Sequence, residues 1–150
     1  MSVQQIMTRN PVTVMMDDSL SKVKELFDQH RFHHLLVVDQ GKLFGVVSDR
    51  DLLKALSPHL GTLSETARDR ASLNRKVHQI MTRKPVVLGQ DASIHDAIAV
   101  FNTHGISCIP IVDAANHPVG ILSWRDILKH IDPRKATAAG QPGQGGRETR

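Results

Sequence analysis

Two short motifs carry the residue types that could perform chemistry in this chain of 150 residues. Ser48 is followed three positions later by Asp51, and Ser123 is followed in the same way by Asp126. Each motif comes after an apolar run and before a helical pattern, so we expect it at a junction between a strand and a helix. A serine at such a junction caps the helix, and an acidic residue three positions later bonds back to a backbone N–H, as in a capping box.

Binding of a nucleotide could use the same geometry. The first turn of a helix has free N–H groups and a partial positive charge, which together suit a phosphate. The hydroxyls of Ser48 and Ser123 add donors, and the carboxylates of Asp51 and Asp126 can accept hydrogen bonds from both ribose hydroxyls. Capping and ribose binding are therefore two interpretations that can hold together in one protein.

An arginine precedes the aspartate in both motifs, as Arg50 and Arg125. The planar guanidinium group is well shaped to pair with phosphate oxygens. The simpler interpretation is a solvated helix residue, or an ion pair with a neighbouring side chain. Because both motifs have arginine in the same position, the pattern favours a phosphorylated ligand over a neutral nucleoside.

The motifs belong to an internal repeat that covers most of the chain. Residues 6–12 return as residues 80–86, and one residue inserted in the second turn lengthens the shift by one position afterwards. Each repeat has about 50 residues, which is a hard size to stabilise alone because too little surface is buried. We therefore expect the two units to pack on each other and to fold as one globule.

Each unit has the same order of expected elements: strand, helix, strand, strand, helix. Ser19 and Ser93 are suitable N-caps for the first helix of each unit, because a serine side chain accepts hydrogen bonds from the first turn. Apolar residues at helical spacing follow both serines, and β-branched runs separated by turn residues then predict a hairpin. The expected strands are 12–14, 35–38 and 43–47 in the first unit, and 86–88, 106–112 and 119–122 in the second.

The sequence resembles a tandem pair of cystathionine-β-synthase-type (CBS) domains, also called a Bateman module, of the stand-alone bacterial type. The resemblance rests on Ile-Met-Thr before Pro-Val in both units, on the strand at 106–113, and on the motifs at 45–51 and 120–126. It covers roughly residues 3–132. It implies an α+β fold of two β-α-β-β-α modules related by a pseudo-two-fold axis.

The implied organisation has modules at residues 3–56 and 77–132, joined by a linker at 57–76. The linker has no clear apolar period, and its residues 65–70 could form either a polar helical turn or a mobile loop. Residues 133–150 contain almost nothing to bury, so we expect them to form a flexible tail.

Members of this family usually sense adenosine-containing ligands in the cleft between the two modules. The resemblance therefore implies AMP, ADP or ATP, or else S-adenosylmethionine, as a regulatory ligand, with no cofactor required. It places adenine in an apolar slot that also offers backbone hydrogen bonds, although plain core packing is the alternative for each residue of the slot. The residues implied for this slot are Val12, Thr13, Leu35, Leu36, Val86, Val87, Cys108, Ile109 and Pro110.

The two units differ within this slot. Pro110 of the second unit stands where the first unit has Leu36, and His33-His34 replaces the smaller Ser107-Cys108 pair. We therefore expect one of the two clefts to be altered or empty, and the sequence leaves open which one.

Histidines raise an alternative in which the chain is a ligand-free or metal-binding structural dimerisation module. His30, His33 and His34 cluster near the expected end of a helix, but they lack a firm ligand spacing. No glycine-rich phosphate loop, nucleophile elbow or zinc-hydrolase motif occurs, and Cys108 lies in an apolar strand. We therefore expect no metal site and no enzyme activity.

The composition of the chain limits the classes of molecule that we expect it to bind. The net charge of +4 is spread without a dense basic stripe, which disfavours nucleic acid as a partner. No apolar run approaches the roughly 20 residues of a membrane helix, and the single cysteine cannot form an internal disulfide. We expect a cytoplasmic protein without membrane contact that forms a homodimer, as the family commonly does, and that acts on an effector protein which the sequence does not identify.

Overall fold

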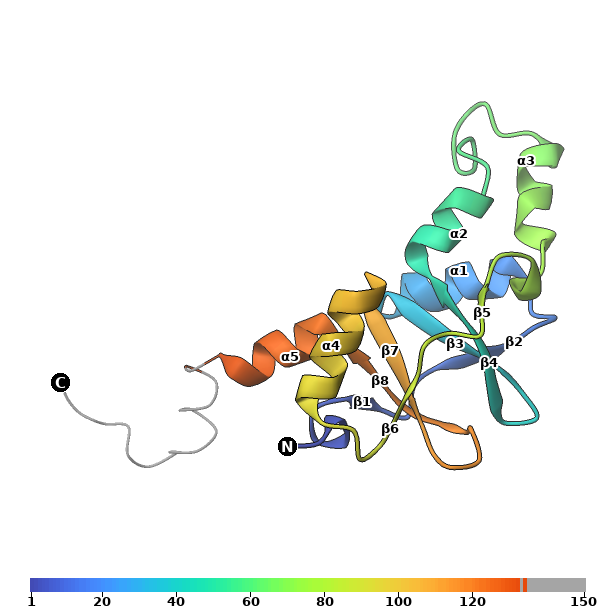
Figure 1. Cartoon of the computed structure of the whole chain (residues 1–150). Helices are drawn as coiled ribbons and strands as arrows, with labels where there is room; N and C mark the ends of the chain where they lie inside the picture. The colour runs from blue at the N-terminus through green and yellow to red at the C-terminus, as the bar shows by residue number, and fades with distance from the viewer. Residues whose placement is uncertain (133, 135–150) are drawn as a thin grey trace.

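The computed structural model describes residues 1–132 and 134, and it contains two β-sheets of four strands each (Figure 1). The α+β class is confirmed, and so is the order of strand, helix, strand, strand, helix within each half. The first half contains β1 (Thr8–Arg9), β2 (Thr13–Met15), α1 (Leu20–Gln29), β3 (His34–Asp39), β4 (Lys42–Ser48) and α2 (Asp49–Ala55). The second half contains β5 (Thr82–Arg83), β6 (Leu88–Gly89), α4 (Ile94–His104), β7 (Cys108–Val112), β8 (Pro118–Ser123) and α5 (Trp124–Ile131). The predicted flexible tail falls on residues 133–150, which lie outside the described residues except for Arg134.

The helices α1 and α4 begin at the serines that the sequence predicts as caps. Ser19 Oγ accepts a hydrogen bond from the backbone N–H of Lys22 (3.3 Å), and Ser93 Oγ accepts one from that of Asp96 (3.0 Å). Helix α4 ends at Gly105, whose φ of 62° is the left-handed conformation that glycine adopts without steric cost. Local chemistry therefore determines where these helices start and where α4 stops.

The two sheets have corresponding strand orders, β2-β3-β4-β5 and β6-β7-β8-β1. In each sheet a parallel pair, β2 with β3 or β6 with β7, lies beside an antiparallel hairpin, β3-β4 or β7-β8. The outer strands are exchanged between the halves of the chain, because β5 pairs with β4 and β1 pairs with β8. The sequence does not predict β1 and β5, and it starts β2 and β6 slightly too early.

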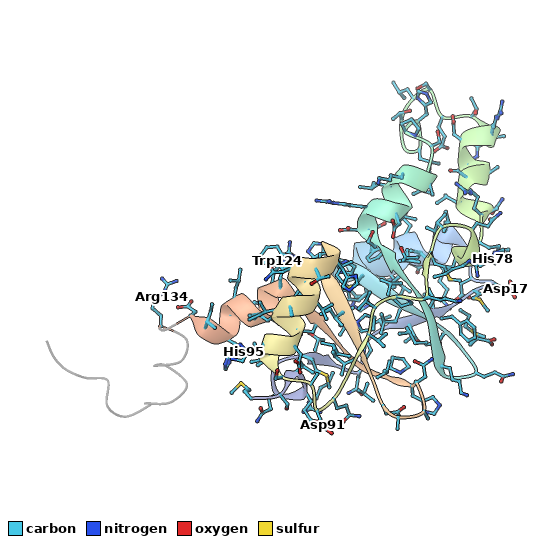
Figure 2. All side chains as sticks on the ribbon, in the orientation of Figure 1. Asp17, His78, Asp91, His95, Trp124 and Arg134 are labelled. Atoms are coloured by element: carbon cyan, nitrogen blue, oxygen red, sulfur yellow. The ribbon has the colours of Figure 1, made fainter. Side chains whose placement is uncertain are left out.

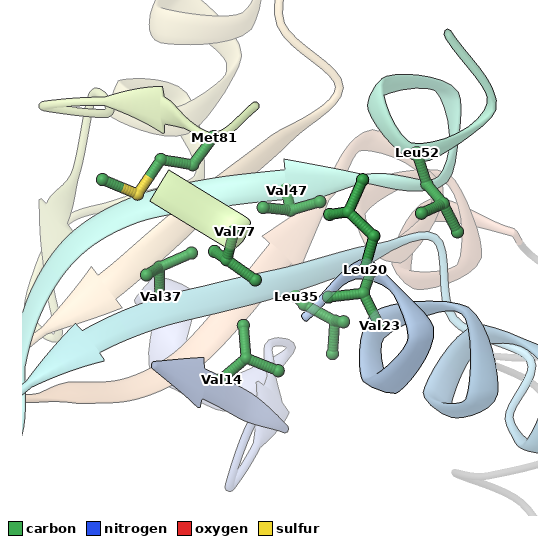
Figure 3. Packing of buried hydrophobic residues seen from close by; sticks show 9 residues of the cluster. All are labelled: Val14, Leu20, Val23, Leu35, Val37, Val47, Leu52, Val77 and Met81. Atoms are coloured by element: carbon green, nitrogen blue, oxygen red, sulfur yellow. The ribbon is translucent and has the colours of Figure 1, made fainter. Parts of the chain in front are cut away.

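The exchange extends to the two hydrophobic cores. Val77 and Met81, from the second half, pack into the core of the first module (Figure 3). Val3 and Met7, from the first half, pack into the core of the second module. Val3 and Val77 are fully buried. Neither half of the chain therefore completes its core alone.

A third cluster of apolar side chains lies between the two sheets. Successive side chains of a strand point to opposite faces. Strand β3 accordingly directs Leu35 and Val37 into the core of its own module and Leu36 into the contact between modules. Strand β7 places Cys108 and Val112 in the same contact. This shared layer joins the two modules into the one globule that the sequence predicts.

The linker forms a helix, α3 (Ala67–Ala71). Of the two structures expected for residues 65–70, a polar helical turn or a mobile loop, the structure therefore shows the helical one. Thr66 caps this helix, and the Ser57 hydroxyl donates to Asp69 Oδ1 (2.7 Å), which ties α3 to the end of α2. In Figure 1, α3 stands beside α2 and far from α4 and α5. Within the part of the chain that the structure describes, no helix is long and apolar enough to cross a membrane.

Candidate functional site

Both serine–aspartate motifs form capping boxes at the junctions β4–α2 and β8–α5. Asp51 Oδ2 accepts a hydrogen bond from the backbone N–H of Ser48 (2.9 Å), and Ser48 Oγ accepts one from that of Asp51 (3.0 Å). The corresponding distances are 2.8 and 3.3 Å for Ser123 and Asp126. These bonds confirm the capping interpretation. They use one carboxylate oxygen of each aspartate, and among the described residues the other oxygen accepts no hydrogen bond.

The first motif lies in a cavity of about 390 Å³ between the two modules, which we name the Asp51 pocket. One wall comes from the end of β4 and the start of α2. The opposite wall comes from the second half of the chain, at residues 84–86 and 105–108. The residues that line this pocket are His34, Val46, Ser48, Arg50, Asp51, Thr82, Lys84, Pro85, Val86, Gly105, Ile106, Ser107 and Cys108.

The second motif lines a smaller cavity of about 220 Å³, which we name the Asp126 pocket. Most of its lining residues occupy the same repeat positions as those of the Asp51 pocket: Thr8 corresponds to Thr82, and residues 31–34 correspond to residues 105–108. The pseudo-two-fold axis therefore relates the two pockets. The residues that line this pocket are Thr8, Arg31, Phe32, His33, His34, Cys108, Ile121, Ser123, Arg125, Asp126 and Lys129.

A third depression of about 380 Å³, which we name the central groove, lies between the two motifs. Arg50 and Arg125 both line it, together with Leu53 and Trp124. The Arg125 guanidinium lies 4.9 Å from the centre of the Trp124 ring, a distance typical of a cation–π contact. Trp124 is labelled in Figure 2. Among residues 1–132 and 134, neither arginine forms an ion pair. Both guanidinium groups therefore remain available to an anion.

His34 lies at the meeting point of all three depressions. Its Nε2 is 3.1 Å from Ser107 Oγ, a hydrogen bond that links the two modules. Burial lowers the pKa of His34, and the nearby Asp49 carboxylate opposes this shift. The neighbouring His33 contacts Asp49 directly, with 2.8 Å between Nδ1 and Oδ2.

The structure separates the residues predicted for the adenine slot into two groups. Val86 and Cys108 line the Asp51 pocket, where the motif residues Ser48, Arg50 and Asp51 also lie. The others line none of the three depressions. Thr13 is exposed, and the remaining residues are buried or half-buried, most of them in the hydrophobic clusters: Val12, Leu35, Leu36, Val87, Ile109 and Pro110. Ser123, Arg125 and Asp126 lie in the second pocket.

Several lining residues were not predicted from the sequence. Lys84 and Pro85 enter the Asp51 pocket from the segment before β6, and Gly105 enters it from the end of α4. Lys84 has a φ of 50°, a left-handed conformation that is uncommon for a residue with a side chain. The only available signal was its counterpart in the repeat, Asn10, which has a φ of 52° and is of a residue type that tolerates this conformation.

Burial also raises the pKa of the Cys108 thiol, to about 12. A neutral thiol of this kind packs as a small apolar group and is a poor nucleophile. The histidine side chains do not gather around one point, as metal binding would require. The His30 ring stacks on Phe32 at 5.0 Å between centroids, and His33 contacts Asp49. Within the described residues, no three His, Cys, Asp or Glu side chains are arranged to hold a metal ion.

Comparison with known proteins identifies the family. The sequence model named CBS domain matches residues 3–58 and 77–133. Since these two matches cover well over half of the chain, the chain belongs to the CBS domain family.

Curated relatives include proteins of different lengths. A homoserine O-acetyltransferase from Methanocorpusculum labreanum is 30% identical over 124 residues, which cover 82% of this chain and 23% of that protein. A CBS domain-containing protein of Dictyostelium discoideum is 28% identical over 128 residues, which cover 84% of this chain and 88% of that protein. The chain spans only 23% to 46% of the length of several relatives.

Solved structures of CBS-pair proteins have the same fold. CBSX2 in complex with AMP is 27% identical and superposes with a TM-score of 0.71, covering 86% of this chain and 94% of that chain. CBSX2 from Arabidopsis thaliana gives 26% identity and a TM-score of 0.74, with coverages of 90% and 96%. The CBS domain pair of protein MJ0100, in complex with 5′-methylthioadenosine and S-adenosyl-L-methionine, gives 25% identity and a TM-score of 0.73, with coverages of 90% and 98%.

Proposed function

We propose that this chain is a regulatory module that binds an adenosine-containing ligand, AMP, ADP or ATP, and does not catalyse a reaction. The nucleoside occupies the Asp51 pocket. The observation that carries this proposal is the cavity of about 390 Å³ between the modules, which combines an apolar wall, a carboxylate and two cationic side chains. A volume of this size is within the range of roughly 300–1,000 Å³ that is usual for small-molecule sites.

The chemistry of the pocket suits each part of a nucleotide. Val46, Val86 and Ile106 offer an apolar slot for adenine. The carboxylate oxygen of Asp51 that takes no part in capping accepts hydrogen bonds from the ribose hydroxyls. Arg50 and Lys84 then pair with phosphate.

The ligands of similar proteins agree with this assignment. CBSX2 binds AMP, and the MJ0100 pair binds 5′-methylthioadenosine and S-adenosyl-L-methionine. These molecules share an adenosine group and differ in their 5′ substituent. We therefore assign the common adenosine group to the Asp51 pocket and keep S-adenosylmethionine as a second candidate, to be compared directly with the nucleotides.

The test compares two aspartates with the same capping role. Asp96 of α4 forms a capping box with Ser93 at distances of 2.9 and 3.0 Å, which equal those of Asp51 with Ser48, and it lines none of the three depressions. We expect Asp51→Ala and Asp96→Ala each to destabilise the fold by about 1 kcal/mol, because each loses a cap. Calorimetric titration should show at least a tenfold loss of nucleotide affinity in Asp51→Ala and none in Asp96→Ala.

The outcomes separate the site from the function. Unchanged nucleotide affinity in Asp51→Ala would show that the ligand does not bind in this pocket. If wild-type protein freed of carried-over ligand binds no adenine compound at all, the chain is instead a structural dimerisation module.

We also propose a homodimer in the cytoplasm that acts on an effector protein. Leu53 of α2 and Leu128 and Ile131 of α5 are more than half exposed, and such apolar surface often marks an interface. The single buried cysteine agrees with a reducing compartment. Light scattering should show that Leu128→Glu produces monomers, whereas Leu63→Glu, at a fully exposed position of the linker, leaves the dimer intact.

A further inference from the structure

The two pseudo-equivalent pockets differ in size, and named side chains explain the difference. Residues 105–107 of the Asp51 pocket are glycine, isoleucine and serine, whereas residues 31–33 at the same positions of the Asp126 pocket are arginine, phenylalanine and histidine. The larger side chains accompany a decrease in volume from about 390 to about 220 Å³. The Asp126 pocket therefore falls below the roughly 300 Å³ at which small-molecule sites begin.

The smaller pocket is also the more positively charged of the two. Arg31, Arg125 and Lys129 line it beside one carboxylate, that of Asp126. Among residues 1–132 and 134, none of these three cations forms an ion pair. Three unpaired cations around a small cavity suit a compact anion, and phosphate groups have the charge and the acceptor oxygens for it.

The central groove connects this charge to the Asp51 pocket. Arg50 lines both the Asp51 pocket and the groove, and Arg125 lines both the Asp126 pocket and the groove. His34 lines all three depressions. A chain of phosphates can therefore leave the Asp51 pocket past one guanidinium and meet the second before it reaches Lys129.

We propose that the Asp126 pocket binds the phosphate end of a nucleotide whose nucleoside occupies the Asp51 pocket, and does not bind a second nucleoside. This inference rests on the proposed function and specifies the ligand as a single nucleoside triphosphate per chain. A monophosphate contacts the cations of the Asp51 pocket only, so it binds more weakly.

Titration calorimetry of the full chain with ATP and with AMP tests this inference. We expect one ATP per chain, bound at least tenfold more tightly than AMP. Lys129→Gln should reduce ATP affinity about tenfold, the effect of losing one charged contact of typical strength, and should leave AMP affinity unchanged. Lys54→Gln is the matched control, because Lys54 is the counterpart of Lys129 in the first repeat and lines none of the three depressions.

Arg31→Gln provides a second variant with the same expectation, in case Lys129→Gln lowers the thermal stability. Two nucleotides bound per chain would overturn the inference, and so would equal affinities of the wild-type protein for ATP and AMP. A loss of affinity in Lys129→Gln and Arg31→Gln that is as large for AMP as for ATP would also overturn it. In each of these cases nucleotide binding that depends on Asp51 would still support the proposed function. A wild-type protein that binds no nucleotide would instead refute the proposed function itself.

Discussion

The Met7 side chain lies over Gly120, so close that a Cβ atom on this glycine would overlap the methionine sulfur. Met81 covers Gly45 in the same way, and a Cβ there would lie 2.9 Å from the Met81 sulfur and 2.8 Å from the Thr82 carbonyl oxygen. In both pairs the methionine comes from the other half of the chain. The repeated glycines therefore allow the exchanged strands β1 and β5 to approach β8 and β4.

The first prediction concerns these glycines. Gly45→Ala should destabilise the fold by about 1–3 kcal/mol, because a backbone carbonyl has to move. Gly120→Ala should cost less, since only the flexible Met7 side chain needs to turn. Gly89→Ala is the control, because a Cβ there would meet nothing within 4 Å. Urea unfolding measures the three values, and equal values for Gly45→Ala and Gly89→Ala would contradict the close packing.

The second prediction concerns the coupling of the two modules. Val77→Ala removes two methyl groups from the core of the first module, which should cost about 2 kcal/mol. The only tryptophan, Trp124, belongs to the second module. If the exchange makes the chain one cooperative unit, Trp124 fluorescence and far-ultraviolet circular dichroism should report the same shifted transition. A Trp124 transition that stays at its wild-type position would show that the modules unfold independently.

Local patterns were enough to predict the repeated elements. Ser19 and Ser93 mark helix starts because capping depends on residues only three positions apart. Strands β1 and β5 have two residues each and no apolar alternation. They are strands only because partners from the other half of the chain pair with them, and no local pattern contains that information.

In the candidate site too, residues with a local sequence signal were predicted, and residues that depend on distant parts of the chain were missed. Asp51 and Arg50 were predicted because the motif repeats, whereas Lys84 and Gly105 were missed because they reach the pocket from the opposite module. Leu35 and Ile109 were assigned to the slot from the resemblance, yet both side chains are fully buried in module cores. The altered cleft was predicted without its position. That expectation stays a prediction; the Asp126 pocket is the smaller of the two, and there Phe32 and His33 replace smaller residues.

The third prediction concerns pH. Because burial lowers the pKa of His34 in the folded protein, the unfolded chain binds a proton at higher pH than the folded chain does. The contribution of His34 to stability is therefore full above its ordinary pKa of about 6.5 and is lost as the pH falls through the lower folded value. The groups that act on it are the carboxylates of Asp49 and Asp51, which raise its pKa, and the side chains of His33 and Arg125, which lower it.

Unfolding free energies between pH 7.5 and 5.5 test this prediction. Wild-type protein should lose stability on acidification, and His34→Gln should lose less, because glutamine keeps a hydrogen-bonding side chain that does not titrate. His95→Gln, at an exposed position on α4 (Figure 2), should keep the wild-type slope. Identical slopes for His34→Gln and wild type would mean that His34 does not cause the acid sensitivity.

The fourth prediction concerns the thiol that lines the Asp51 and Asp126 pockets. Burial raises the pKa of Cys108 to about 12, so the reactive thiolate is scarce at pH 8. An exposed cysteine in the unfolded chain has a pKa of about 8.5. Iodoacetamide should therefore modify the native protein on the order of a hundredfold or more slowly than the urea-unfolded protein, with mass spectrometry as the readout. A bound nucleotide should slow the native reaction further, because Cys108 forms part of the pocket wall. Rapid modification of the native protein would show that Cys108 is ionised or exposed, and burial as the cause of its raised pKa would then be wrong.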